Sequence, residues 1–125
     1  MSAPLLGREQ ILAVLRDLAE QLDRQGVRAE VFLVGGAAIT LAYDTRRATR
    51  DVDAIFEPKQ TVYAAARRVA DNHELPEDWL NDAVKGFLHG EDPDAVPVLD
   101  TPGLRVDVAS PRYLLAMKLR VPVRG

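Results

Sequence analysis

The order of apolar and polar residues predicts helices and strands in alternation along the 125-residue chain. Apolar residues spaced three and four apart indicate amphipathic helices, and continuous or alternating apolar runs indicate strands. A serine followed by a proline marks the start of the last helix. We therefore expect helices over residues 7–24, 37–42, 61–72, 77–87 and 111–119, strands over residues 29–34, 51–56 and 104–109, and a loop over residues 90–97.

Two glycines, Gly35 and Gly36, follow the first expected strand. Glycine lets the backbone turn sharply and approach a ligand that any Cβ would keep away. The short helix expected directly after them would present free amide groups and the positive end of its dipole, which favour a triphosphate. The pair is therefore predicted to form a phosphate-binding turn.

Two aspartates, Asp51 and Asp53, stand at the start of the second expected strand. Residues two apart in a strand point to the same face, so the two carboxylates should lie side by side. Such neighbours raise each other's pKa unless a cation sits between them. The expected cation is Mg²⁺, because this hard ion prefers oxygen ligands and shares them with substrate phosphates.

Four further polar residues each have a structural and a functional interpretation. Asp107 lies between two valines in an alternating strand, where it either faces water or adds a third carboxylate to a two-metal site. Arg47, in an arginine-rich loop before the aspartates, is either solvated or contacts a phosphate. Lys118 is either an ordinary cation at the end of a helix or a triphosphate contact. Asn81, on the polar face of the helix expected over residues 77–87, either belongs to a pocket or faces solvent, and solvent is the favoured interpretation.

Composition and charge narrow the classes of protein. The chain contains no cysteine, which excludes disulfides and thiolate zinc sites. It shows neither a signal peptide nor an apolar run of membrane-spanning length, so we expect a cytoplasmic protein without a membrane partner. A net charge of −3 argues against nonspecific nucleic-acid binding. However, residues 112–124 hold four basic residues and no acid, so this segment is a candidate for phosphate contacts.

Three motifs in this order resemble the signature of the polymerase-beta-type nucleotidyltransferase superfamily: Val34-Gly35-Gly36, Asp51-Val52-Asp53 and Val106-Asp107-Val108. Other motifs are similar to small bacterial nucleotidyltransferases that are toxin subunits of abortive-infection, type IV toxin–antitoxin pairs: Arg47-Ala48-Thr49-Arg50-Asp51-Val52-Asp53, Asp78-Trp79-Leu80-Asn81-Asp82 and Met117-Lys118-Leu119-Arg120. In those relatives a lysine at the position of Lys118 helps bind the nucleotide. A further acidic motif follows it there, whereas this chain ends at Gly125.

The resemblance implies an α/β (α+β) fold with a small mixed β-sheet backed by helices. It implies a single nucleotidyltransferase domain over residues 1–125, either cut short at its C-terminus or belonging to a minimal branch. Asp51, Asp53 and Asp107 would hold Mg²⁺, or Mn²⁺ in its place, and carry catalysis. An NTP would bind at residues Gly35, Gly36, Arg47 and Lys118. The expected acceptor of the nucleotide is RNA such as tRNA, and the expected partner is a cognate antitoxin.

Two other functions stay open at this point. The first is a module that binds nucleotide or a partner subunit without turnover, and metal-dependent NTP turnover separates it from an enzyme. The second is a nucleotidyltransferase that modifies a small molecule or a protein. Here the acidic stretch over residues 71–100, with nine acids and a single base, would favour a cationic small molecule over RNA.

Overall fold

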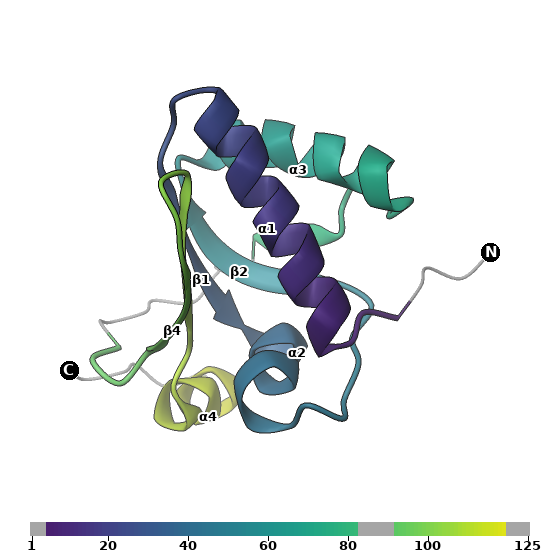
Figure 1. Cartoon of the computed structure of the whole chain (residues 1–125). Coiled ribbons are helices and arrows are strands. Elements are labelled where there is room, and N and C mark those ends of the chain that lie inside the picture. The colour runs from purple at the N-terminus through teal and green to yellow at the C-terminus, as the bar shows by residue number, and fades with distance from the viewer. Residues whose placement is uncertain (1–4, 83–91, 120–125) are drawn as a thin grey trace.

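The computed structural model describes residues 5–82 and 92–119, which form one mixed sheet with helices (Figure 1). The helices are α1 (Arg8–Arg24), α2 (Gly35–Ala38) with its π-helical continuation η1 (Ile39–Tyr43), α3 (Lys59–His73) and α4 (Pro111–Leu119). The strands are β1 (Ala29–Val34), β2 (Val52–Glu57), β3 (Leu80–Asp82), β4 (Val96–Asp100) and β5 (Leu104–Val108). This arrangement confirms the expected α/β (α+β) class with a small mixed sheet backed by helices.

The sheet has the strand order β3-β2-β1-β5-β4, so the first strand of the sequence lies at its centre. Strand β1 runs antiparallel to β2 and parallel to β5. The two edge strands are also mixed in direction: β3 is parallel to β2, and β4 is antiparallel to β5. The central position of β1 places the residues that follow it between the two strands that carry the expected carboxylates.

One face of the sheet, which we call the core face, is covered by α1 and α3 (Figure 1). Alternate residues of the strands point to it and are buried, among them Val31, Leu33, Ala54 and Val106. Helix α1 contributes a stripe at helical spacing, consisting of Ile11, Val14, Leu15, Leu18, Ala19 and Leu22. Burying a large aliphatic side chain stabilises a fold by about 1.5–3 kcal/mol, so this layer supplies most of the stability.

The opposite face, which we call the open face, carries polar residues in the same strands. In the strand registers Val34 lies opposite Asp53, and Phe32 lies opposite Asp107. All four side chains therefore point to the open face. Helix α4 covers one end of this face, where the ring of Tyr113 meets that of Phe32 edge-on with 4.9 Å between their centroids. In the described ranges, no helix is long and apolar enough to cross a membrane.

Two of the predicted elements are wrong. Residues 80–82 of the helix expected over residues 77–87 form strand β3, because Trp79 is buried, donates its indole N–H to the carbonyl of Ala66 at 2.8 Å, and accepts a hydrogen bond from the amide of Val52. Residues 77–79 of that prediction form a turn and a bend, and residues 83–87 lie outside the described residues. The loop expected over residues 90–97 ends too late, since strand β4 already begins at Val96.

The short helix predicted over residues 37–42 starts earlier, at Gly35, so both glycines belong to its first turn. The backbone of Gly35 has a positive φ of 63°, which an L-residue adopts only with strain. The chain therefore leaves β1 and enters the helix without an intervening loop. Other boundaries agree with the sequence: α1 ends before Gly26, whose φ is 67°, and Ser110 caps α4 through a hydrogen bond that its hydroxyl accepts from the amide of Tyr113 at 3.1 Å.

Candidate active site

The glycine turn and the aspartate strand are in direct contact. Because Val34 lies opposite Asp53 in the antiparallel pair, the chain that turns at Gly35 passes over the Asp53 side chain. A Cβ placed on Gly35 would lie 3.2 Å from Asp53 Oδ2. Two sequence motifs that are separated by a helix and a loop thus meet at one point, where only glycine combines the positive φ with room for the carboxylate.

Asp51 and Asp53 are held together by Asn81. Asp51 lies immediately before β2 and is exposed, whereas Asp53 is half-buried within the strand. Asn81 is the register partner of Asp53 on β3 and donates its amide to Asp51 Oδ2 at 3.1 Å. Burial, and after it the negative charge of Asp51, raises the pKa of Asp53, and hydrogen bonding by Asn81 offsets part of this rise. A buried carboxylate whose pKa is raised partly by a neighbouring carboxylate forms a place where a cation would be favoured.

Thr49 fixes the loop that leads into the aspartates. Its hydroxyl donates to the carbonyl of Asp51 at 3.0 Å, and its Oγ1 lies 3.0 Å from where a Cβ on Gly36 would be. Its backbone exchanges two hydrogen bonds with Leu6, at 2.6 and 2.9 Å. The second glycine and the first aspartate are thus both positioned by one threonine, and nearby Arg47 is exposed on the same loop.

Asp107 lies on the same open face but is engaged elsewhere. Its register partner Phe32 is two residues before Val34, the partner of Asp53, so the two carboxylates are offset along the sheet by about 7 Å. Arg105 donates from both Nε and Nη2 to Asp107 Oδ1, each at 3.2 Å. Within residues 5–82 and 92–119, no three histidine, cysteine or acidic side chains gather closely enough to hold a metal ion. The structure therefore brings Gly35, Asp51 and Asp53 together but leaves Asp107 beside Arg105.

Helix α4 is anchored at its start, while Lys118 lies exposed in its last turn. Asp92 accepts two hydrogen bonds from Ser110, from the amide at 2.7 Å and from the hydroxyl at 2.8 Å. Burial, with a further contribution from the charge of Asp92, raises the pKa of Tyr113 to about 12, so this phenol stays neutral. The basic segment predicted to contact phosphate continues through Arg120 and Arg124, which lie outside the described residues.

Two residues of this site were not identified from the sequence. The sequence predicts a helix around Asn81 and favours solvent exposure for it, whereas its contact with the aspartates follows only from the pairing of β3 with β2. Thr49 occurs in the Arg-Ala-Thr-Arg-Asp motif that carries the resemblance, but sequence spacing gave it no function. In both cases the available signal was the motif itself, in which a small polar residue stands near an acid.

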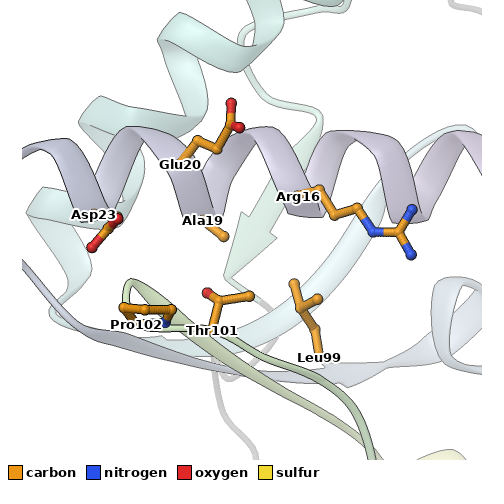
Figure 2. Close-up of a pocket in the computed structure, with 7 residues that line it drawn as sticks. All are labelled: Arg16, Ala19, Glu20, Asp23, Leu99, Thr101 and Pro102. Atoms are coloured by element: carbon orange, nitrogen blue, oxygen red, sulfur yellow. The ribbon is translucent and has the colours of Figure 1, made fainter.

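Two hollows lie away from the aspartate pair. One of them, of about 360 Å³, lies between α1 and the turn joining β4 to β5, where Figure 2 shows Ala19 of α1 facing Thr101. Since Leu99 lies opposite Val106 in the register, this hollow is on the core-face side and is no part of the site. The other, of about 440 Å³, is lined by Arg28, Glu30, Glu57 and Pro58 at the far end of the open face.

A mixed sheet with a glycine turn against an aspartate pair is consistent with a small nucleotidyltransferase fold, and a comparison with family models supports this class. The model described as a nucleotidyltransferase of unknown function (DUF6036) matches residues 9–89, well over half of the chain. The chain belongs to this family. Neither a curated protein nor a solved structure matches it. The matched segment contains Gly35, Gly36, Asp51 and Asp53, whereas Asp107 and Lys118 lie beyond it.

Proposed function

We propose that the protein transfers a nucleoside monophosphate from an NTP to an acceptor with the help of Mg²⁺, for which Mn²⁺ can substitute. The observation that carries the proposal is the contact between Gly35 and Asp53, with Asp51 beside them. Backbone without a side chain, next to two carboxylates, suits a ligand that is both a phosphate and a metal complex. The family description supports transfer of a nucleotide.

The donor set at this point fits a hard divalent ion. Asp51 and Asp53 offer carboxylate oxygens, and the raised pKa of Asp53 means that a nearby positive charge would stabilise its ionised form. When bound there, Mg²⁺ would neutralise phosphate charge and lower the pKa of the attacking hydroxyl. Asp107 is the third carboxylate of the proposed set, and it reaches the pair only if it leaves Arg105.

The residues of the chain then divide the reaction between them. Gly35 and Gly36 seat the β- and γ-phosphates, with Arg47 and Lys118 as further contacts of the triphosphate. The acceptor hydroxyl oxygen attacks the α-phosphorus and forms a new P–O bond, while the bond from the α-phosphorus to the oxygen bridging to the β-phosphate breaks. Asp107 takes the hydroxyl proton, and pyrophosphate leaves with the bonding electron pair.

We propose RNA, and tRNA in particular, as the acceptor. Arg47 and Arg50 are exposed on the loop that Thr49 fixes beside Asp51, and Arg112 and Lys118 are exposed on α4. Such cations can border a negatively charged site and contact a nucleic-acid backbone. Together with the motif similarity to type IV toxins, this supports a toxin role in the cytoplasm with a cognate antitoxin as partner.

The test is incubation with each labelled NTP and Mg²⁺ or Mn²⁺, with tRNA, other RNA, a protein mixture and an aminoglycoside as competing acceptors. We expect label on RNA, loss of transfer by at least a hundredfold in Asp53→Asn, and unchanged transfer in Asp71→Asn, which alters an exposed aspartate on α3. NTP binding without label on any acceptor would identify a binding module. If neither NTP nor metal bound, the proposal would be wrong.

A cationic small molecule is the second candidate acceptor, and one observation favours it. Glu30 and Glu57 face each other in the β1–β2 register and line the hollow on the same open face as Asp53. Salt distinguishes the two acceptors, because each phosphate contact with RNA contributes about one unit to the logarithmic salt slope. Loss of slope in Arg47→Ala would support RNA, and an unchanged slope in Arg46→Ala, Arg47→Ala and Arg50→Ala would favour the small molecule.

A further inference from the structure

Four charged side chains of alternating sign lie in a row at the β4–β5 side of the open face. Arg28 donates to Asp100 Oδ1 at 2.9 Å and to the carbonyl of Thr101 at 2.6 Å. The other carboxylate oxygen of Asp100 lies 3.7 Å from Nη1 of Arg105. Arg105 in turn donates to Asp107. The guanidinium of Arg105 thus already lies between two carboxylates, one of which is the proposed third catalytic acid.

The strand register explains why this contact matters for the site. Along β1, residues Glu30, Phe32 and Val34 lie opposite Arg105, Asp107 and Asp53 in that order. Arg105 and Asp53 therefore lie on opposite sides of Asp107 along the sheet. In the structure Asp107 binds Arg105, a residue on its far side from the aspartate pair, and the described residues contain no group of three acids that could hold a metal ion.

The ion pair between Arg105 and Asp107 is weak enough to open and close reversibly. The Arg105 side chain is 38% exposed and that of Asp107 is 29% exposed, while Asp100 is 58% exposed. Ion pairs with this much contact with water change an equilibrium by only about twofold to fivefold. A divalent ion bound at Asp51 and Asp53 can therefore compete for Asp107, and Asp100 is in place to keep the guanidinium paired.

We propose that Arg105 is a positioning residue that holds Asp107 away from the aspartate pair in the free protein and passes to Asp100 when a metal–nucleotide complex takes Asp107. This inference rests on the proposed function, since it concerns the same carboxylates. It adds a residue to which neither the motifs nor the family description assigns a role. Arg105 does not contact the reacting atoms and acts only through Asp107.

The experiment is calorimetric titration of the full chain with Mn²⁺ in the presence of a nonhydrolysable NTP. Arg105→Gln removes the competitor for Asp107, so the dissociation constant for Mn²⁺ should fall about twofold to fivefold. Asp100→Asn removes the alternative partner of Arg105, so the constant should rise. Arg24→Gln, which changes an exposed arginine on α1 paired with Glu20, should have no effect.

Two further variants distinguish the direct contact of Arg105 with Asp107 from the general electrostatic effect of a positive charge on Mn²⁺ binding. Arg105→Lys keeps the charge but cannot donate from two nitrogens in the same plane, so the dissociation constant should still fall. In an Asp107→Asn background, Arg105→Gln should change nothing, because the proposed effect passes through Asp107. Equal effects of Arg105→Gln with and without Asp107, or a wild-type constant in Arg105→Lys, would overturn the inference.

The outcomes also separate this inference from the proposed function. If the wild type binds Mn²⁺ and Arg105→Gln binds it equally tightly, the role of Arg105 is wrong while the function stands. If neither protein binds Mn²⁺, the proposed function fails and the inference fails with it. Should Arg105→Gln unfold, as circular dichroism would show, Arg105→Lys and Asp100→Asn carry the same test with opposite expected signs.

Discussion

Substituting Gly35 by alanine tests whether the contact between the glycine turn and Asp53 organises the site. Two separate penalties are expected. The positive φ of 63° costs an L-residue about 1–2 kcal/mol, of which the reduced freedom of the unfolded chain returns about 0.5 kcal/mol. In addition, the new Cβ would lie 3.2 Å from Asp53 Oδ2, so the carboxylate must shift by a few tenths of an ångström, at about 0.5–1.5 kcal/mol.

Gly26→Ala is the matched control for this substitution. Gly26 has nearly the same backbone conformation, with a φ of 67°, but nothing lies within 4 Å of the position of its Cβ. It should therefore show the backbone penalty alone, about 1 kcal/mol, against about 2 kcal/mol for Gly35→Ala. For a chain of this length these values correspond to a lowering of Tm by about 4 °C and 8 °C respectively.

The assay is thermal unfolding with and without Mn²⁺ and a nonhydrolysable NTP. A ligand that binds only the folded state raises Tm by mass action. This rise should persist in Gly26→Ala and shrink or vanish in Gly35→Ala, since only the latter displaces Asp53. Equal Tm values for the two variants, together with equal ligand-induced rises, would refute the idea that the contact between Gly35 and Asp53 organises the site.

Three further predictions concern stability. Gly103→Ala should destabilise the fold by about 3 kcal/mol in urea unfolding, because its Cβ would lie 2.7 Å from the amide nitrogen of Asp23 in the packed α1 backbone. The pKa of Asp53 is raised, mainly by burial, so without metal its contribution to stability should be lost as pH rises above 3.8; the stability of the wild type relative to Asp53→Asn should therefore fall between pH 3 and 8 in unfolding experiments. Burial alone would raise the pKa of Asp17, but hydrogen bonds, led by that from Asn72, outweigh burial and lower this pKa. Asp17→Asn should therefore lower the free energy of unfolding by about 1 kcal/mol at pH 7 and by less in acid, which unfolding experiments across pH would measure.

The elements with strong periodicity were predictable from the sequence. The strand predicted over residues 29–34 has the same bounds as β1, and the predicted first helix begins one residue before α1. Both segments carry an apolar pattern that fits only one period, so local sequence and tertiary packing agree. The start of α4 was likewise predictable, because the hydroxyl of Ser110 satisfies a free amide of the first turn.

Short elements at the sheet edges could not be predicted, because partners distant in sequence decide them. Residues 80–82 form a strand because they pair with the edge of β2 and because the indole of Trp79 donates a hydrogen bond to a carbonyl of α3. Strand β4 contains Pro97 and exposed residues, and among the described residues it pairs only with β5, with a register shift between Pro97 and Leu99. Their patterns contain too few buried residues to define a period.

The same distinction separates the parts of the candidate site. The motifs identified Gly35 and Asp53 from sequence, and the structure shows their side-by-side placement. The contact of Asn81 with Asp51 depends on the pairing of β3 with β2, so no spacing along the chain predicts it. Arg105 and Asp107 are two residues apart in one strand and so share a face, but the sequence does not show that their side chains bind each other. The residues that orient the acids of a site are thus the ones that could not be identified from a single sequence.

The division of the sheet into a core face and an open face has a consequence for protein engineering. Positions such as Glu30, Ile55 and Glu57 alternate with buried core residues, yet they contribute little to the packing under α1 and α3. Substitutions at such positions usually change stability by no more than about 0.5 kcal/mol. A library randomised there would vary the open face from its far end to the neighbourhood of Asp53, while the buried residues that stabilise the fold lie on the other side of the same strands. Ligand preference could therefore be selected almost independently of folding.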